Sequence, residues 1–312
     1  MPSPVPHVTS FNASAPELQP GYKASYLTVD VEEYYHAEAF SGILDPVERD
    51  RYPAHVVENT MELLQLFQDC EVRGTFFLLG SVAEKYPGLT RSILEAGHEI
   101  ASHGNGHRMV TKMTPAEFRE DVRKSKRILE DITGKTVLGY RAPTFSIVKD
   151  TEWAYEILRD EGFRYSSSVF PIRHDRYGWA TFGLSPRKMA VRGDRWIWEI
   201  PLSVERIGGI NFPFGGGGYL RLYPMSLTKY FFRRLLRNDR PSVVYVHPWE
   251  IDRDHPRVAM PVLKRIRHYV GIKGMEEKIR ELLRSFPFER MDEFLKCAPA
   301  PRQQDIPAWG SR

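Results

Sequence analysis

Short apolar segments alternate with amphipathic segments along most of this chain. Runs rich in β-branched and aromatic residues predict strands over residues 25–31, 74–79, 98–102, 138–141, 163–169, 197–204 and 242–247. Apolar positions at helical spacing predict helices over residues 56–70, 82–96, 114–132, 151–161 and 225–237. The helix from residue 114 has the clearest start, with Thr114 as N-cap, Pro115 at the first position and Glu117 at the third. Strands that alternate with helices in this way indicate βα units around a parallel sheet.

The number of these units sets the expected architecture. About seven units in 312 residues favour a distorted (β/α)7-type barrel of the α/β class over an open sheet. We expect a single domain over residues 23–297, including a C-terminal extension. Residues 1–22 are rich in proline and small or polar residues, and we expect a disordered leader there and a similar tail over residues 298–312.

Polar residues suited to chemistry stand where several of these strands end. Asp30 and Glu32 close the first strand, His103 follows the third, Arg141 the fourth and His247 the last. The carboxyl ends of parallel strands meet at one edge of a sheet, so these side chains are predicted to converge there. The alternative is a buried structural network of ion pairs, which we consider less favoured because so many strand ends are involved.

The segment from His103 to His107 carries two imidazoles four residues apart. This spacing predicts that both lie on one face of a helical turn. Together with one carboxylate they would form a two-His, one-carboxylate site for a divalent metal, with positions left for water and substrate. Asp30 and Glu32 are two apart in a strand and therefore face the same side, so one could bind the metal while the other acts as a base.

Composition narrows the class of protein only slightly. Hydrophobic residues make up 42% and charged residues 27%, which is typical of a globular protein. The net charge of +4 favours an anionic partner only weakly and does not indicate nucleic-acid binding. Cys70 and Cys297 have no metal-ligand spacing, and we expect two reduced, partly buried thiols. No apolar run approaches the roughly 20 residues of a membrane span, and no secretory signal precedes the first strand, so a cytoplasmic location is expected.

Some features admit two interpretations. His98 is better explained as a hydrogen-bonded structural histidine, whereas His36 could reach the mouth of the site or simply pack on the surface. The glycines 215–218 lack a Gly-Lys-Ser/Thr ending and open no clear helix, so a flexible loop over a sugar groove is favoured over a phosphate loop. Residues 233–237 form a basic helix face, for which solvation is favoured over contact with anionic lipid.

Four motifs, in order, resemble those of the polysaccharide deacetylases with a NodB-homology domain, carbohydrate esterase family four. Residues 28–32, Thr-Val-Asp-Val-Glu, correspond to the family's Thr-Phe-Asp-Asp-Gly, and residues 103–107 to its His-(Ser/Thr)-x-x-His. Residues 141–145, Arg-Ala-Pro-Thr-Phe, resemble the third motif, and Val246-His247 the last. The segments 215–222 and 247–252 resemble a bacterial subgroup that is encoded with exopolysaccharide and exosortase-linked gene clusters.

The resemblance implies an N-deacetylase that releases acetate from N-acetylated amino sugars of a polysaccharide or of its lipid-linked precursor. It implies that Glu32, His103 and His107 bind a divalent metal, with zinc expected. Asp30 would be the general base, Arg141 its partner, and His247 the acid that protonates the leaving amine. A backbone N–H near Thr144 would meet the oxyanion. Three aromatic residues of the loops could either stack on sugar rings or pack on the barrel rim: Phe214, Tyr219 and Trp249.

The chain departs from the family pattern at three places. Val31 separates the two acidic residues, a spacing that is familiar from allantoinase-like members, so a small-amide hydrolase remains an alternative. Ser166 stands where relatives often carry the Asp that braces the arginine, which supports a non-catalytic carbohydrate-binding homologue as a further alternative. Gly104 replaces a Ser or Thr, which removes one possible side-chain hydrogen bond.

Overall fold

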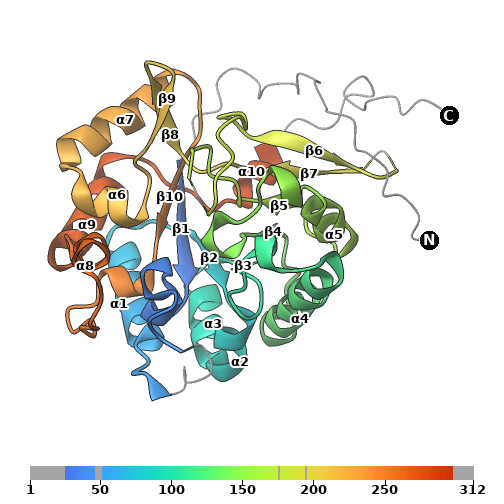
Figure 1. Ribbon diagram of the computed structural model, residues 1–312, viewed down its shortest axis with the longest axis horizontal. Coiled ribbons are helices and arrows are strands. Elements are labelled where there is room, and N and C mark those ends of the chain that lie inside the picture. Colours follow the sequence, from blue (N-terminus) through green and yellow to red (C-terminus); the bar gives the residue numbers. More distant parts are fainter. Residues whose placement is uncertain (1–24, 46–50, 175, 194, 298–312) are drawn as a thin grey trace.

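The structure is a computed structural model that describes residues 25–45, 51–174, 176–193 and 195–297 (Figure 1). The predicted leader and tail lie outside the described residues. No helix within the described ranges is long and apolar enough to cross a membrane. Cys70 and Cys297 are both free thiols, as expected, but Cys297 is exposed rather than partly buried.

One curved sheet of eight strands organises the described chain. Its strand order is β10-β1-β2-β3-β4-β5-β7-β6. Neighbours are parallel throughout, except that β6 is antiparallel to β7 at the edge. The bounds of these strands are β1 Ser25–Val31, β2 Thr75–Leu78, β3 Glu99–Ser102, β4 Gly139–Tyr140, β5 Tyr165–Ser166, β6 Arg187–Val191, β7 Arg195–Glu199 and β10 Ser242–Val246. The seven parallel strands agree with the predicted βα architecture, and within the described ranges the order has two ends, so the sheet is a half-barrel.

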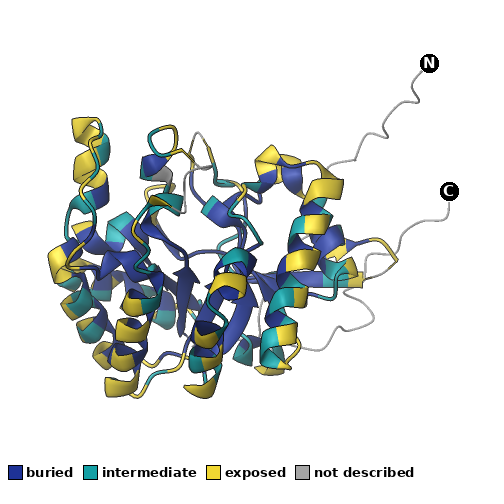
Figure 2. Cartoon of the chain, turned by 90° about the horizontal axis from the view of Figure 1, so that it is seen from below, coloured by how far each residue is buried: buried dark blue, intermediate teal, exposed yellow. Residues whose placement is uncertain are grey.

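Helices cover the outside of this sheet, and their outward faces are exposed while the strands are buried (Figure 2). A separate hairpin of β8 (Val204–Ile207) and β9 (Ile210–Pro213) lies beside α7 (Figure 1). The helices are α1 Val56–Asp69, α2 Gly80–Lys85, α3 Pro87–Glu95, α4 Pro115–Thr133, α5 Ala154–Asp160, α6 Gly217–Leu222, α7 Met225–Arg237, α8 Val262–Tyr269, α9 Met275–Ser285 and α10 Glu293–Cys297.

Local sequence chemistry explains where the elements begin and end. The Thr114 hydroxyl accepts the N–H of Glu117 and the Glu117 carboxylate accepts the N–H of Thr114, so the predicted capping box starts α4. Gly134 ends the same helix in the left-handed conformation. The single helix predicted over residues 82–96 is wrong: Pro87 cannot continue a helix from the preceding turn, so α2 ends and α3 starts there.

The glycines 215–218 do not form the predicted flexible loop. Gly217 opens α6, and the backbone at residues 215–216 runs alongside β10, where Tyr245 donates its N–H to the Gly215 carbonyl at 2.9 Å. A Cβ at Gly216 would lie 2.1 Å from the Tyr245 carbonyl oxygen. Glycine is required at this position because two backbones approach each other closely.

Candidate active site

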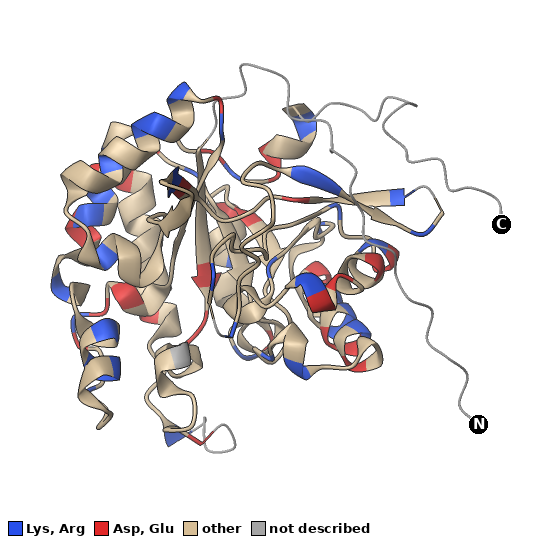
Figure 3. Ribbon diagram, turned by 45° about the horizontal axis from the view of Figure 1, so that its top comes forward, with Lys and Arg blue, Asp and Glu red and all other residues tan. Residues whose placement is uncertain are grey.

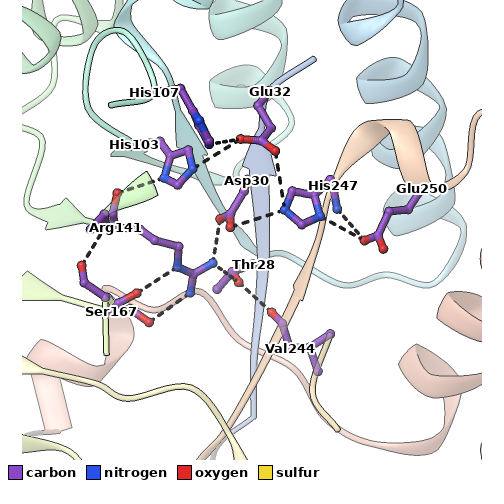
Figure 4. Close-up of polar contacts among 12 residues, drawn as sticks. Thr28, Asp30, Glu32, His103, His107, Arg141, Ser167, Val244, His247 and Glu250 are labelled. Atoms are coloured by element: carbon purple, nitrogen blue, oxygen red, sulfur yellow. Dashed lines mark hydrogen bonds and ion pairs between the residues drawn. The ribbon is translucent and has the colours of Figure 1, made fainter. Parts of the chain in front are cut away.

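The polar residues at the strand ends meet at one edge of the sheet (Figure 4). Asp30 lies near the end of β1, Glu32 and His103 directly follow β1 and β3, and Arg141 and His247 directly follow β4 and β10. Asp30, Glu32, His103 and Arg141 are each at most 3% exposed. The predicted convergence is therefore present in the structure. It arises because neighbouring parallel strands deliver their carboxyl ends to the same place.

Arg141 fixes one carboxylate in the centre of this site. Its Nη1 donates to Asp30 Oδ1 and to the Thr28 hydroxyl, both at 2.7 Å, and Thr28 in turn donates to the Val244 carbonyl. The guanidinium is fully buried and lies over the Phe77 ring, with 4.1 Å from Cζ to the ring centroid. This arrangement binds Asp30 Oδ1 and leaves Oδ2 facing His247, whose Nε2 is 4.0 Å away.

Glu32, His103 and His107 form the candidate metal centre. Glu32 Oε2 lies 2.6 Å from His107 Nε2 and 3.7 Å from His103 Nε2, and one ligand atom of each residue lies within 4.8 Å of the other two. His103 Nδ1 is 2.9 Å from the Arg141 carbonyl oxygen, so the proton belongs on Nδ1 and the Nε2 lone pair points to Glu32. Burial would raise the pKa of Glu32, but the two imidazoles hold it well below its usual range. The carboxylate is thus an anion facing two imidazole nitrogens.

The spacing predicted that the two imidazoles share a helical turn. This prediction is wrong. Residues 103–107 form an irregular loop in which Gly104 and His107 both adopt positive φ, at +75° and +57°. Asp121 of α4 holds the loop by accepting the N–H groups of Asn105 and Gly106. A Cβ at Gly104 would lie 2.8 Å from Asp121 Oδ2, so a Ser or Thr would have to displace this carboxylate oxygen and adopt a strained positive φ. The Ser102 hydroxyl accepts the Gly104 N–H.

His247 lies across the site from the imidazole pair, with Nε2 3.8 Å from Glu32 Oε1. Its Nδ1 is 3.2 Å from Glu250 Oε2, which also accepts the His247 backbone N–H. The other oxygen of Glu250 pairs with Arg221 Nε at 2.9 Å. Burial would lower the pKa of His247, but the hydrogen bond to Glu250 and the charges of Glu250, Glu32 and Asp30 raise it to about 9. His247 is therefore a cation near neutral pH.

The bracing of Arg141 comes from Ser167 rather than from residue 166. Arg141 Nε donates to the Ser167 carbonyl and Nη2 to the Ser167 hydroxyl, each at 3.0 Å. Ser166 donates to Ser168, which accepts the Ala142 N–H. The buried carboxylate of Glu199, at the end of β7, accepts the N–H groups of Ser168 and Val169 and so fixes the loop after β5. Position 166 thus stabilises the backbone beside Arg141 without contacting its guanidinium.

A pocket opens above His107 and is lined by aromatic and polar residues of the segment after β1. Its lining consists of Tyr35, His36, Ala37, Phe40, Ser41, Gly42, Leu44, Asp45, Tyr52, His107, Met109 and Thr144. His36 stacks on His107 with ring centroids 5.1 Å apart, so it is at the mouth of the site, as one of its two interpretations held. Thr144 and Phe145 adopt positive φ, at +56° and +49°, which costs about 1–2 kcal/mol per residue. Such strain is typical of functional loops.

The three loop aromatics occupy different places. Trp249 is 5% exposed and its ring stacks on those of His247 and His268, which agrees with packing on the rim, while its contact with sugar stays a prediction. Phe214 is fully buried in the core. Tyr219 is partly buried beside Tyr223, outside the pocket lining, and its contact with substrate stays a prediction. The stacked contact of Trp249 with His247, with ring centroids 5.0 Å apart, helps to fix the orientation of that imidazole.

Sequence reasoning missed three residues that hold the site together. Glu250 and Ser167 contact His247 and Arg141 directly, and Glu199 fixes the backbone next to them. Glu250 lies three residues after His247 and so carried a positional signal, whereas Glu199 stood inside the strand that was expected over residues 197–204. Ser167 carried none. By contrast, His98 is the structural histidine that was expected: it is buried and its Nδ1 accepts the Gly74 N–H.

Comparison with known families agrees with this geometry. Residues 48–165 match the family model described as polysaccharide deacetylase. This segment is similar to the polysaccharide deacetylases. Residues 167–296 match a second model, a domain of unknown function called DUF3473. In the structure the two segments share one sheet, because β5 pairs with β7. The deacetylase segment contributes His103, His107 and Arg141, and the DUF3473 segment contributes His247 with Glu250.

Curated relatives match over part of their length. The chain is 33% identical over 107 residues to a peptidoglycan deacetylase of Helicobacter pylori, a match that covers 34% of this chain and 36% of that protein. It is 34% identical over 131 residues to a peptidoglycan-N-acetylglucosamine deacetylase of Bacillus cereus, which covers 40% of this chain and 46% of that protein. The chain therefore spans less than half the length of these relatives.

Solved structures share the fold. A protein of Mycobacterium smegmatis assigned to the polysaccharide deacetylases aligns with a TM-score of 0.63 at 22% identity, over 94% of this chain and 98% of that one. The PuuE allantoinase aligns with a TM-score of 0.61 at 17% identity, over 95% of this chain and 97% of that one. At these identities the likeness concerns the fold alone, which is the curved sheet with its covering helices.

Proposed function

We propose that this protein is a metal-dependent N-deacetylase that removes acetyl groups from N-acetylated amino sugars of a bacterial polysaccharide or its lipid-linked precursor. The observation that carries the proposal is the arrangement of three chemical groups around one point. They are a carboxylate held by Arg141, a two-His, one-carboxylate centre and a cationic histidine. His247 Nε2 lies 4.0 Å from Asp30 Oδ2 and 3.8 Å from Glu32 Oε1. The family match and the names of the curated relatives support the same reaction class.

The residues of the candidate metal centre fit a divalent cation. Glu32 Oε2 is buried and has no hydrogen bond of acceptable geometry within the described chain, although two imidazole nitrogens face it. Nitrogen and carboxylate ligands in this number suit Zn²⁺, which we propose as the ion. When bound, Zn²⁺ would polarise the amide carbonyl and lower the pKa of a water ligand towards about 7. Glu32, His103 and His107 would hold it.

The remaining residues would move the protons. Asp30, with Oδ1 held by Arg141 and Oδ2 free to face the substrate, takes a proton from the attacking water. His247 lies across the site from His103 and His107, beside Glu32 Oε1. As a cation it donates a proton to the nitrogen of the departing amino sugar. The C–N bond of the amide breaks as acetate and a free amine form. A backbone N–H near Thr144 would stabilise the oxyanion.

The lining of the pocket supports a saccharide substrate. The aromatic residues that line the pocket, among them Tyr35 and Tyr52, provide faces of the kind that sugar rings contact. We propose an intracellular, lipid-linked saccharide as the substrate, in line with the resemblance to the exopolysaccharide-associated subgroup. Tyr219 remains a candidate for contact with a longer substrate.

Acetate release separates this function from its alternatives. The full-length protein, loaded with Zn²⁺, is incubated in parallel with N-acetylglucosamine oligomers and with allantoin. A deacetylase releases acetate from the oligomers and leaves allantoin intact. Ring-opening of allantoin without acetate release would instead identify a small-amide hydrolase. Binding of the oligomers without any reaction would identify a carbohydrate-binding homologue.

A further inference from the structure

Helix α8 turns its apolar side chains away from the protein. Val262, Leu263 and Ile266 are 61%, 63% and 55% exposed. At about 100° per residue these three side chains lie within an arc of roughly 100°, and His268 lies opposite to them. His268 is 3% exposed and is the one buried residue of the helix. The apolar stripe of a surface helix normally faces the core, so this orientation is the reverse of the usual one.

Positive charge surrounds this apolar stripe. By the same helical spacing Arg265 and Arg267 lie on the two flanks of the stripe, while Lys264 lies nearer the side of His268. None of these three side chains forms an ion pair within the described residues. Residues 255–274 contain five Lys or Arg residues and no Asp or Glu. Figure 1 places α8 at the outer edge of the molecule, and many Lys and Arg positions appear along that edge in Figure 3.

The helix is fixed to the wall of the active-site pocket. Lys264 Nζ donates to the Ser41 carbonyl at 3.4 Å, and the His268 ring contacts the Phe40 ring with centroids 4.6 Å apart. Phe40 and Ser41 both line the pocket. His268 also stacks on Trp249, which stacks on His247. A surface bound by the stripe would therefore be separated from the pocket wall by the thickness of one helix, about 10–12 Å.

We propose that residues 257–267, which we call the α8 segment, bind an anionic lipid surface. Exposed apolar side chains flanked by basic residues match the interface between acyl chains and anionic headgroups, where both can be satisfied together. An aqueous partner would leave this stripe in water or require a complementary apolar groove. The lipid surface would hold the pocket mouth near membrane-anchored molecules. If the proposed function also holds, the substrate is a saccharide presented at the membrane.

Vesicle binding tests this proposal without reference to activity. The full-length protein is co-sedimented with vesicles of equal parts phosphatidylglycerol and phosphatidylcholine, and with vesicles of phosphatidylcholine alone. We expect binding to the anionic vesicles and little to the neutral ones. Each basic residue near an anionic surface contributes about fivefold in affinity. At about 1 M salt the Debye length falls to about 3 Å, so binding should largely disappear.

Two sets of variants assign the binding to α8. The triple variant Val262→Ser, Leu263→Ser, Ile266→Ser should weaken vesicle binding on the order of tenfold or more, because the apolar contribution is lost. The matched control Ile207→Ser, Ile210→Ser removes side chains that are 45% and 63% exposed on the β8–β9 hairpin. It should leave binding within about twofold of the parent.

Three results would overturn the assignment. They are absence of binding to anionic vesicles, a larger effect of the hairpin variant than of the α8 variant, and binding to a soluble acidic polysaccharide but not to vesicles. The last result would identify an acidic polymer as the partner. The triple variant should release acetate from soluble oligomers at the parental rate. Absence of acetate release by the parent would contradict the proposed function and would leave the result of vesicle binding unaffected. Loss of vesicle binding with that rate unchanged would support the role of α8 alone.

Discussion

Glu250→Gln should shift the pH range in which the enzyme works. Glu250 Oε2 lies 3.2 Å from His247 Nδ1, and the pKa of His247 is raised to about 9 despite its burial. Glutamine keeps the shape but removes the charge. A hydrogen bond to a charged group contributes about 1.5–3 kcal/mol, which corresponds to about one to two pKa units. His247 must carry a proton to donate it, so activity falls as pH rises through its pKa. The variant should therefore lose activity about one to two pH units below the parent.

The assay is acetate release from N-acetylglucosamine oligomers between pH 6 and about pH 10. Glu250→Gln also leaves Arg221 without its buried partner, so a loss of stability is expected and must be separated from the pH shift. Glu205→Gln is the matched control, because Glu205 is equally buried and pairs with Arg234 at 2.8 Å in another part of the fold. The control should lose stability while keeping the parental pH profile. An unchanged alkaline limb in Glu250→Gln would refute the role assigned to this carboxylate.

Three further predictions test the fold and the metal centre. Burial lowers the pKa of His98 to about 4, below its unfolded value of 6.5. The neutral imidazole therefore contributes up to about 3 kcal/mol to the free energy of unfolding above pH 6.5, and this contribution is lost as the pH falls towards 4. In chemical denaturation, the free energy of unfolding of His98→Asn should depend less on pH between 4 and 6.5. Gly216→Ala should lower the free energy of unfolding by on the order of 1–3 kcal/mol, because its Cβ would meet the Tyr245 carbonyl. Gly88→Ala, whose Cβ would have nothing within 4 Å, should be neutral or stabilising. Equal effects of the two substitutions in urea denaturation would argue against the close approach at Gly216. Zn²⁺ at 100 times its Kd should stabilise the parent by about 2.7 kcal/mol in thermal unfolding and should have little effect on His103→Ala.

Much of the fold was predictable because its signals are local. The strand over residues 25–31 and the helix over 225–237 have the predicted bounds, since periodic apolar positions define both. The polar residues at the strand ends also predicted the position of the site, because parallel strands bring their carboxyl ends together. Elements that depend on tertiary contacts escaped prediction. The segment 197–204 was expected to be one strand, but β7 ends at Glu199 and β8 begins at Val204, on either side of Pro201.

The site was predictable in its residues but less so in its geometry. The His103–His107 spacing indicated a helical turn, whereas the loop depends on Asp121, which lies on the following helix, α4. The bracing of Arg141 looked incomplete at Ser166, but the next residue supplies it through its carbonyl and hydroxyl. For Trp249 the sequence left contact with sugar and packing on the rim both open, and only the structure shows that its ring stacks on His268. Such contacts join segments that a linear pattern cannot connect.

The central claim is that Asp30 acts as the base while Glu32, His103 and His107 hold the metal. Asp30→Asn tests it directly, with Zn²⁺ affinity and acetate release measured on the same preparation. Because the three ligands remain, Zn²⁺ should bind with nearly parental affinity, while the rate of acetate release falls by about 10²–10⁴. Parental acetate release from the Zn²⁺-loaded variant would contradict the account.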